Sequence, residues 1–122
     1  GQLALSAADF PGGEARQDDT VRLLAFALWC LEARRDWSRD GLWGDMQALA
    51  TGLGIKIRDL LPPLFVAVSG SRNSFSVIDA MHLLGPDMTR ARLRHAIEVL
   101  GGISKKAGKR LEKEFAGLSI ER

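Results

Sequence analysis

The chain has 122 residues, of which 46% are hydrophobic and 26% are charged, the proportions of an ordinary soluble globular protein of one domain. No apolar run approaches the roughly 20 residues that a membrane span needs, and the single cysteine, Cys30, excludes both an intrachain disulfide and a zinc site built from thiolates. The net charge of +2 and the isoelectric point near 9.0 permit an acidic partner without requiring one.

The N-terminal segment up to residue 17 is expected to be irregular, because Pro11 and the glycines at 12 and 13 interrupt any regular pattern. The start of the chain lacks the basic flank and the long apolar stretch of a signal peptide. Gly1 resembles the remnant of a tag, so we expect the sequence to begin inside a longer protein. The cytoplasm is the expected compartment.

The first predicted helix spans residues 18–37, with Asp18 or Asp19 as its N-cap. Five of its apolar residues recur at helical spacing, namely Val21, Leu24, Ala25, Leu28 and Leu31. Further apolar residues lie on its other faces, so this helix needs neighbours on more than one side. A break is predicted at residues 38–43, around Gly41, before a shorter helix that ends at Gly52 or Gly54.

The stretch LFVAVSG, residues 64–70, fits two structures. It can be a short buried strand that leads into a polar loop, or part of a helix that begins at Pro62 and Pro63 and ends at Gly70. An isolated strand would leave its backbone groups unpaired in a chain that is otherwise helical. We therefore predict that the two prolines form the first turn of a helix.

The second half of the chain has clear helix boundaries. Ser76 and Asp79 resemble a capping box that opens a helix, which Gly85 closes. Pro86 stands near the start of the next helix, where its missing N–H does no harm, and glycines 101–102 follow the end of that helix.

The last predicted helix covers residues 104–118 and carries its apolar residues on one face. These residues are Ala107, Leu111 and Phe115. The sequence therefore predicts an all-α protein, a compact cage or bundle of about six helices with no sheet. Residues 1–38 are expected to hold a leader and a helix of a preceding helical subdomain, and residues 39–122 to form a C-terminal helical domain.

The sequence contains no constellation of catalytic or metal-binding residues. His82 and His95 do not stand in a ligand pattern such as H-E-x-x-H. Ser69 and Ser71 lie in VSGS, which lacks the spacing and the strand–turn–helix context of a nucleophile elbow. We expect neither catalysis nor a bound metal or cofactor in this chain.

The basic residues indicate a different activity. The loop GSRNSFS, residues 70–76, carries Arg72, Asn73, several hydroxyl groups and Phe75. Such groups read unstacked RNA bases through hydrogen bonds to the base edges and through ring stacking. Other basic residues lie before and after this loop. For residues 105–113, where Glu112 is interleaved with lysines, we expect an ordinary solvated helix face. The basic residues considered beside Arg72 are Lys56, Arg58, Arg90, Arg92, Arg94, Lys105, Lys106, Lys109 and Arg110.

Several of these segments resemble, in order, the C-terminal anticodon-binding region of bacterial glutamyl-tRNA synthetases. The matching stretches are LGIK at residues 53–56, PLFVAVSG at 63–70, NSFSVIDAMHLLG at 73–85 and TRARLRHAI at 89–97. The resemblance runs from about Trp43 to Leu100. It implies an α-helical cage that grips the anticodon loop of the tRNA for glutamate, as part of protein synthesis.

The resemblance also implies the residues that contact the anticodon. The family arginine that meets a base corresponds to Phe65, and the family contacts in the loop before the next helix correspond to Ser74, Ser76 and Val77. Phe75 stands where the family usually has proline. A phenylalanine can stack or fill space but cannot donate hydrogen bonds to a base edge.

We hypothesise that Arg72 or Arg58 supplies the donor that Phe65 lacks. The alternative for Phe65 is that its ring faces the core and touches no base. The anticodon contacts predicted for this chain are therefore Phe65, Arg72, Ser74, Phe75, Ser76, Val77 and Arg58.

The activating motifs of such synthetases, of the H-I-G-H and K-M-S-K-S type, are absent from this sequence. We expect the chain itself not to charge tRNA. The resemblance implies a parent protein that ligates glutamate to tRNA with ATP and magnesium, and in which this chain, expected to be a monomer, works beside the catalytic domain.

Three alternatives remain open at this point. The chain can belong to another class I synthetase with a similar cage, such as the lysyl enzyme. It can be a free-standing helical RNA-binding protein. It can also be a protein-interaction module whose apolar helix, Val21 to Leu31, docks a partner.

Overall fold

The computed structural model describes residues 4–70, 76–118 and 120, and within these ranges it contains six α-helices and no strand. This result confirms the predicted all-α class and excludes the strand interpretation of residues 64–70. Two short 3-10 helices occupy part of the leader that we expected to be irregular. The elements are η1 (Ala7–Asp9), η2 (Gly13–Arg16), α1 (Gln17–Glu32), α2 (Arg39–Leu53), α3 (Ile57–Ser69), α4 (Val77–Leu84), α5 (Pro86–Val99) and α6 (Lys105–Ala116).

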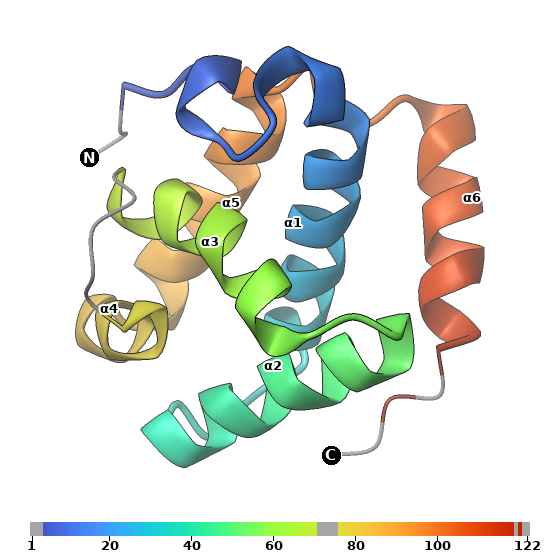
Figure 1. Cartoon of the computed structure of the whole chain (residues 1–122). Coiled ribbons are helices and arrows are strands. Elements are labelled where there is room, and N and C mark those ends of the chain that lie inside the picture. Colours follow the sequence, from blue (N-terminus) through green and yellow to red (C-terminus); the bar gives the residue numbers. More distant parts are fainter. Residues whose placement is uncertain (1–3, 71–75, 119, 121–122) are drawn as a thin grey trace.

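Helix α1 lies at the centre of the molecule, as its apolar residues on several faces require (Figure 1). It packs against α5, α2 and α3, while α4 packs against α2, α3 and α5. Helix α6 stands on the far side of α1 from α3 and α4. One hydrophobic core joins the leader and all six helices, and its largest fully buried side chains include Phe10, Leu24, Phe26, Leu31, Leu42, Met46, Leu60, Leu64, Met81 and Leu93. The boundary predicted at residue 38 stays a prediction.

The start of α1 differs from the predicted one. Arg16, and not an aspartate, occupies the N-cap position, and Asp18 and Asp19 lie in the first turn. Carboxylates in the first turn are favourable there because they oppose the partial positive charge of the helix N-terminus. The two aspartates therefore stabilise the start of the helix without capping it.

The end of α1 comes five residues earlier than predicted, at Glu32. Arg90 of α5 donates from its Nη2 atom to the carbonyl oxygens of Leu31, at 2.8 Å, and of Arg34, at 3.1 Å. The Arg90 guanidinium also lies over the ring of Trp37, 5.4 Å from its centroid. These contacts satisfy carbonyls that the helix end leaves without an intrahelical partner, and a partner from another helix is not visible in local sequence.

The predicted break at Gly41 is wrong. Ser38 is the N-cap of α2, and its Oγ atom accepts a hydrogen bond from the Gly41 N–H at 3.0 Å, so Gly41 lies within the first turn. A Cβ atom at this position would overlap the guanidinium of Arg34. Gly41 therefore lies beneath a side chain that crosses over the helix and is not part of a loop. Helix α2 ends at Gly54, one of the two expected positions, with φ of 70°.

The predicted start of α3 is also wrong, because the helix begins at Ile57 and holds Pro62 and Pro63 inside it. Each proline removes one N–H donor from the helix. The turn before the prolines nevertheless forms, because Ile57, Leu60 and Leu64 continue one apolar stripe that packs into the core. Gly70, with φ of 80°, ends the helix as predicted.

The predicted starts of α4 and α5 are confirmed. The Ser76 hydroxyl accepts a hydrogen bond from the Asp79 N–H at 3.4 Å, and Pro86 is the first residue of α5. The carboxylate of Asp79 accepts a hydrogen bond at 2.7 Å from Nε of Arg39, at the start of α2. Asp79 thus connects two helices in addition to standing at a cap.

The predicted apolar face of α6 is confirmed as well. Leu111 is buried in the core, and the Phe115 ring packs against the rings of Phe26 and Trp29 of α1 at centroid distances of 5.4 and 5.5 Å. Ser104 is the N-cap of α6 and accepts from the N–H of Ala107 at 3.1 Å.

Candidate nucleic-acid interface

The predicted anticodon-reading segment follows α3 and precedes α4 in the chain. Three of the predicted contacts, Arg72, Ser74 and Phe75, lie outside the described residues. The two residues that frame the segment are described. Gly70 closes α3, and Ser76 caps α4.

Phe65 is buried, with 7% of its surface exposed, and packs into the hydrophobic core. Its carbonyl oxygen accepts a hydrogen bond of 2.6 Å from the Ser69 hydroxyl one turn later. This burial favours the interpretation in which the ring supports α3 from within. Contact of Phe65 with a base stays a prediction.

Ser76 and Val77 are adjacent in sequence but differ in exposure. Val77 is 3% exposed and anchors the first turn of α4 in the core, whereas Ser76 is exposed. The Ser76 hydroxyl accepts one hydrogen bond from the backbone and can still donate its proton to another acceptor. Ser76 is therefore available to a ligand from the loop side, and Val77 positions it.

Arg58 is exposed and lies in the first turn of α3. At a rise of 1.5 Å per residue, it lies about 18 Å along the helix from Gly70. The described part of the chain offers it no ion-pair partner. Arg58 thus lies at the start of α3, whereas Phe65 lies nearer to the end that precedes the reading segment.

The arginines at 90, 92 and 94 of α5 contact the ends of two other helices, α1 and α3. Arg90 binds the end of α1, as described above. Arg92 donates from Nη1 to the carbonyl oxygen of Val68 at 2.6 Å, at the end of α3. Arg94 forms an ion pair of 3.2 Å with Glu32, at the end of α1. Positive side chains at helix C-termini bind carbonyls and oppose the negative end of the helix dipole.

Arg92 is the residue of this region whose importance the sequence analysis missed. It fixes the last turn of α3, directly before the predicted reading segment, and its Nε atom is buried with no hydrogen-bond partner among the described residues. A signal was present in the sequence. Alternate residues on a helix point about 200° apart, so Arg92 cannot share a face with Arg90 and Arg94.

Helix α4 is held in place from the side of α2. In addition to the pair between Arg39 and Asp79, the indole N–H of Trp37 donates to the carbonyl oxygen of Met81 at 2.8 Å. A second pair fixes the chain before α2, where Nε of Arg34 donates at 2.6 Å to the fully buried carboxylate of Asp45. Hydrogen bonding to Asp45 raises the pKa of Arg34 above its ordinary value.

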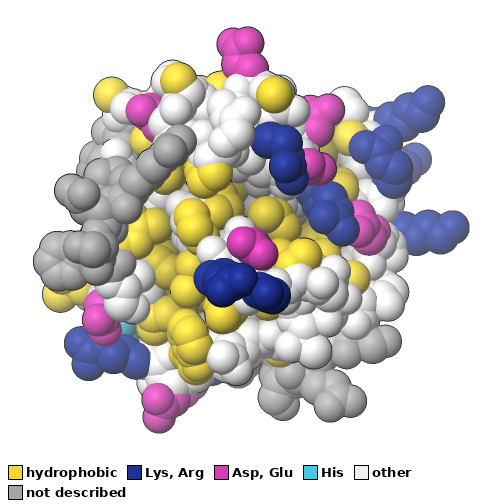
Figure 2. All heavy atoms as spheres, viewed as in Figure 1, with side chains coloured by type: hydrophobic (Ala, Val, Ile, Leu, Met, Phe, Trp, Pro, Cys, Tyr) yellow, Lys and Arg dark blue, Asp and Glu magenta, His cyan; other side chains and the backbone are white. Residues whose placement is uncertain are grey.

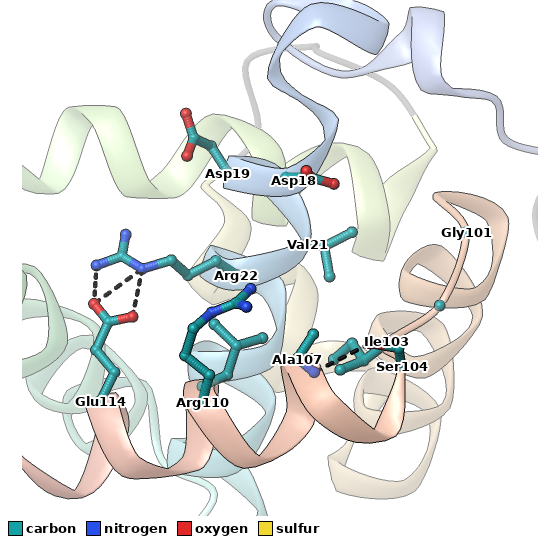
Figure 3. Close-up of a pocket in the computed structure, with 12 residues that line it drawn as sticks. Asp18, Asp19, Val21, Arg22, Gly101, Ile103, Ser104, Ala107, Arg110 and Glu114 are labelled. Carbon is teal, nitrogen blue, oxygen red and sulfur yellow. Dashed lines mark hydrogen bonds and ion pairs between the residues drawn. The ribbon is translucent and has the colours of Figure 1, made fainter.

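A surface hollow of about 410 Å³ lies between the start of α1 and α6 (Figure 3). Asp18 and Asp19 of α1 line one side of it and Arg110 of α6 the other, and Arg22 forms a forked ion pair with Glu114 at one end. The hydrogen bond with Arg22 lowers the pKa of Glu114 and raises the pKa of Arg22. None of the predicted anticodon contacts that the structure describes lines this hollow.

The described residues contain no group of His, Cys, Asp and Glu side chains that could hold a metal ion. Among the helices described, none is long and apolar enough to cross a lipid bilayer.

Comparison with known proteins defines the family. Residues 3–97 match the family model described as the anticodon binding domain. The chain belongs to the anticodon-binding domain family. It is 54% identical over 117 residues to glutamate–tRNA ligase of Saccharophagus degradans. The aligned region covers 96% of this chain and 23% of that protein. It is 49% identical to the protein of the same name from Marinobacter nauticus and 48% identical to that from Alcanivorax borkumensis, in each case over 98% of this chain and 24% of the relative.

The chain therefore spans about a quarter of the length of the curated relatives it matches. The segment between α3 and α4 lies within the part that matches the anticodon-binding domain model, and α6 lies beyond it.

Proposed function

We propose that this chain is the anticodon-binding domain of a glutamate–tRNA ligase and binds the anticodon loop of the tRNA for glutamate. The observation that carries this proposal is the family match over residues 3–97 together with relatives named glutamate–tRNA ligase at 48% to 54% identity. Those relatives favour the glutamate enzyme over the lysyl enzyme and over an unrelated interaction module.

The reading segment in this proposal is residues 70–76. Arg72 and Ser74 hydrogen-bond to base edges, Phe75 stacks on a base, and Ser76 presents its hydroxyl from the cap of α4. Phe65 and Val77 hold the two helices that frame the segment. Loops that carry such residues on a rigid helical support discriminate between bases because a wrong base leaves polar groups buried and unpaired.

In the whole protein, we propose that a separate catalytic domain activates glutamate with ATP and magnesium and transfers it to the tRNA. This chain contributes specificity by differential binding. We further propose that it acts in the cytoplasm as part of a monomeric enzyme, and that residues 1–38 belong to the helical subdomain before the anticodon-binding domain.

The experiment is a titration with two fluorescent RNA stem-loops, one with the glutamate anticodon and one with a scrambled anticodon. We expect tighter binding of the glutamate loop. Combining Arg72→Ala with Ser74→Ala should reduce this preference by about tenfold to a hundredfold, because a lost base contact costs about 1 to 3 kcal/mol of discrimination.

The matched control removes one cation and one hydroxyl elsewhere, by Arg35→Ala with Thr51→Ala, both of which are exposed. This control should keep the full preference. Equal affinity of the unmodified chain for both loops between about 50 and 200 mM salt would contradict the proposal.

A further inference from the structure

The positive charge of the chain is concentrated in α6. This helix has the sequence KKAGKRLEKEFA and carries five of the 17 Lys and Arg residues but only two of the 15 Asp and Glu residues. The chain without α6 therefore has a net charge of −1. A domain that binds a polyanion through its remaining surface would gain little from general electrostatic attraction, because phosphate contacts by Lys and Arg supply most nonspecific affinity for nucleic acids.

The lysines of α6 form one face, which we call the lysine face and define as Lys105, Lys106, Lys109 and Lys113. At 100° per residue these four positions fall within an arc of about 100°. The buried Leu111 lies on the opposite side of the helix. The lysine face is about 12 Å long, at 1.5 Å per residue, and all four of its side chains are exposed.

The lysine face also has no internal partner. Most arginines of the chain bind carboxylates or helix-end carbonyls within the molecule, including Arg16, Arg22, Arg34, Arg39, Arg90, Arg92 and Arg94. None of the four lysines forms an ion pair or a hydrogen bond through its ammonium group within the described residues. In Figure 2, dark blue side chains extend outward from the right edge, where α6 lies.

The support under this face is fixed by specific contacts. Nε of Arg22 on α1 donates to both carboxylate oxygens of Glu114, at 2.9 and 3.0 Å. Figure 3 shows this forked pair beside Arg110, at the end of the close-up away from Ser104 and the start of α6. Together with the rings of Phe26, Trp29 and Phe115, the pair holds α6 against α1 with its lysines directed away from the core.

We propose that the lysine face is a second RNA contact that binds the phosphate backbone of the same tRNA, independently of the anticodon sequence. This inference rests on the proposed function. Helix α6 lies across α1 from α3 and α4, the two helices that frame the reading segment (Figure 1), so we place the contact of the lysine face on backbone outside the bases that the segment reads. The lysines act as exposed point charges, which suits phosphates and carries no base information.

The test replaces all four lysines with glutamine, by Lys105→Gln, Lys106→Gln, Lys109→Gln and Lys113→Gln. Glutamine has nearly the helix propensity of lysine, and the side chains are exposed, so circular dichroism and the urea midpoint should not change. Binding of the glutamate and scrambled stem-loops is then measured across a range of salt concentrations. The matched control is Arg35→Gln, an exposed cation without an ion pair among the described residues.

We expect the quadruple variant to bind both stem-loops more weakly by the same factor. The slope of log affinity against log salt should become less steep by up to about 3.6, because each phosphate contact on a duplex contributes about 0.9. Glu112→Gln removes an exposed negative charge from the same helix and should change affinity in the opposite direction. Arg35→Gln should change neither quantity.

An unchanged affinity and slope in the quadruple variant would overturn the proposal, as would a loss confined to the glutamate stem-loop. Vesicles that contain phosphatidylserine serve as a competing anionic surface. Vesicle binding that depends on the four lysines, with RNA binding unaffected, would assign the face to a membrane instead. The preference between the two loops reports on the proposed function, whereas the common affinity and its salt slope report on the lysine face, so failure of one is distinguishable from failure of the other.

Discussion

Replacing Phe65 tests whether this residue acts from the core or touches RNA. Its ring is 7% exposed, so almost all of its apolar surface is removed from water. Removing a buried phenylalanine ring costs about 3 to 5 kcal/mol, the transfer free energy plus the cavity that remains. A domain of this size has only about 5 to 15 kcal/mol of stability. Phe65→Ala should therefore lose about 4 kcal/mol and leave the protein close to unfolding.

The decisive variant is Phe65→Leu, which keeps most of the volume and should cost about 1.4 kcal/mol. With a slope of about 2 kcal/mol per molar urea, the urea midpoint should fall by about 0.7 M. Because the ring supports α3 and does not contact a base in this interpretation, the folded variant should keep the full preference for the glutamate stem-loop. Phe115→Leu is the matched control, because its ring packs on Phe26 and its helix, α6, lies across α1 from α3 and α4.

The opposite outcome would refute this reasoning. A Phe65→Leu variant that keeps its urea midpoint but loses the preference would show that the ring faces the RNA. Phe65→Arg, which restores the residue type of the resembling family, gives an independent check. A guanidinium at a buried site without a partner costs several kcal/mol, so this variant should be less stable than Phe65→Leu. A stable Phe65→Arg variant with tighter binding would contradict the core assignment.

Three further predictions concern the scaffold. Asp45→Ala leaves Arg34 without its carboxylate and should lower the free energy of unfolding by about 3 kcal/mol. If urea denaturation shows a decrease of less than about 1 kcal/mol, that result would be inconsistent with a buried pair. Gly41→Ala should destabilise the chain, because the new Cβ atom would displace Arg34. In an ordinary helix, replacing glycine with alanine is favourable by about 1 kcal/mol, so a gain in stability would count against this explanation. Arg22 lowers the pKa of Glu114 below its ordinary value of 4.5, so the ionised pair stabilises the fold fully above that value and less as pH falls through the lowered pKa. The difference in unfolding free energy between the unmodified chain and Glu114→Gln should stay under about 1 kcal/mol, since the side chains of Arg22 and Glu114 are both partly exposed. This difference should shrink towards pH 3. Equal differences at pH 7 and pH 3 would exclude this effect.

The sequence predicted those boundaries that local chemistry determines. Gly54, Gly70 and Gly85 end helices through backbone conformations with positive φ, and Pro86 starts one, because these preferences belong to the residue itself. The boundary at Gly41 could not be predicted in this way, since the reason for a glycine there is the guanidinium of Arg34, which comes from another segment.

The exposure of Phe65 was equally hidden from sequence. From residue 63 to residue 68, every residue of α3 is buried, so the helix has no polar face here from which an outward direction could be inferred. The resemblance assigned Phe65 a position among base contacts, and the local pattern neither supported nor opposed that assignment. Only the packing of α3 among α1, α4 and α5 distinguishes a core residue from a binding residue.

The distribution of charge separates the general affinity for RNA from the preference between anticodons in the proposed interface. Around α3 and α4, Arg39 and Arg92 are engaged by a carboxylate and by a helix-end carbonyl, so these cations are already committed within the protein. In the proposed function, discrimination between anticodons comes from short-range hydrogen bonds and stacking, which salt screens weakly, while the lysine face on α6 contributes attraction that every RNA backbone shares. In the ratio of affinities for two stem-loops the shared phosphate contribution cancels. Salt should therefore weaken binding of both loops while leaving the preference between them nearly constant, because the proposals assign general affinity to the lysine face and specificity to the reading segment.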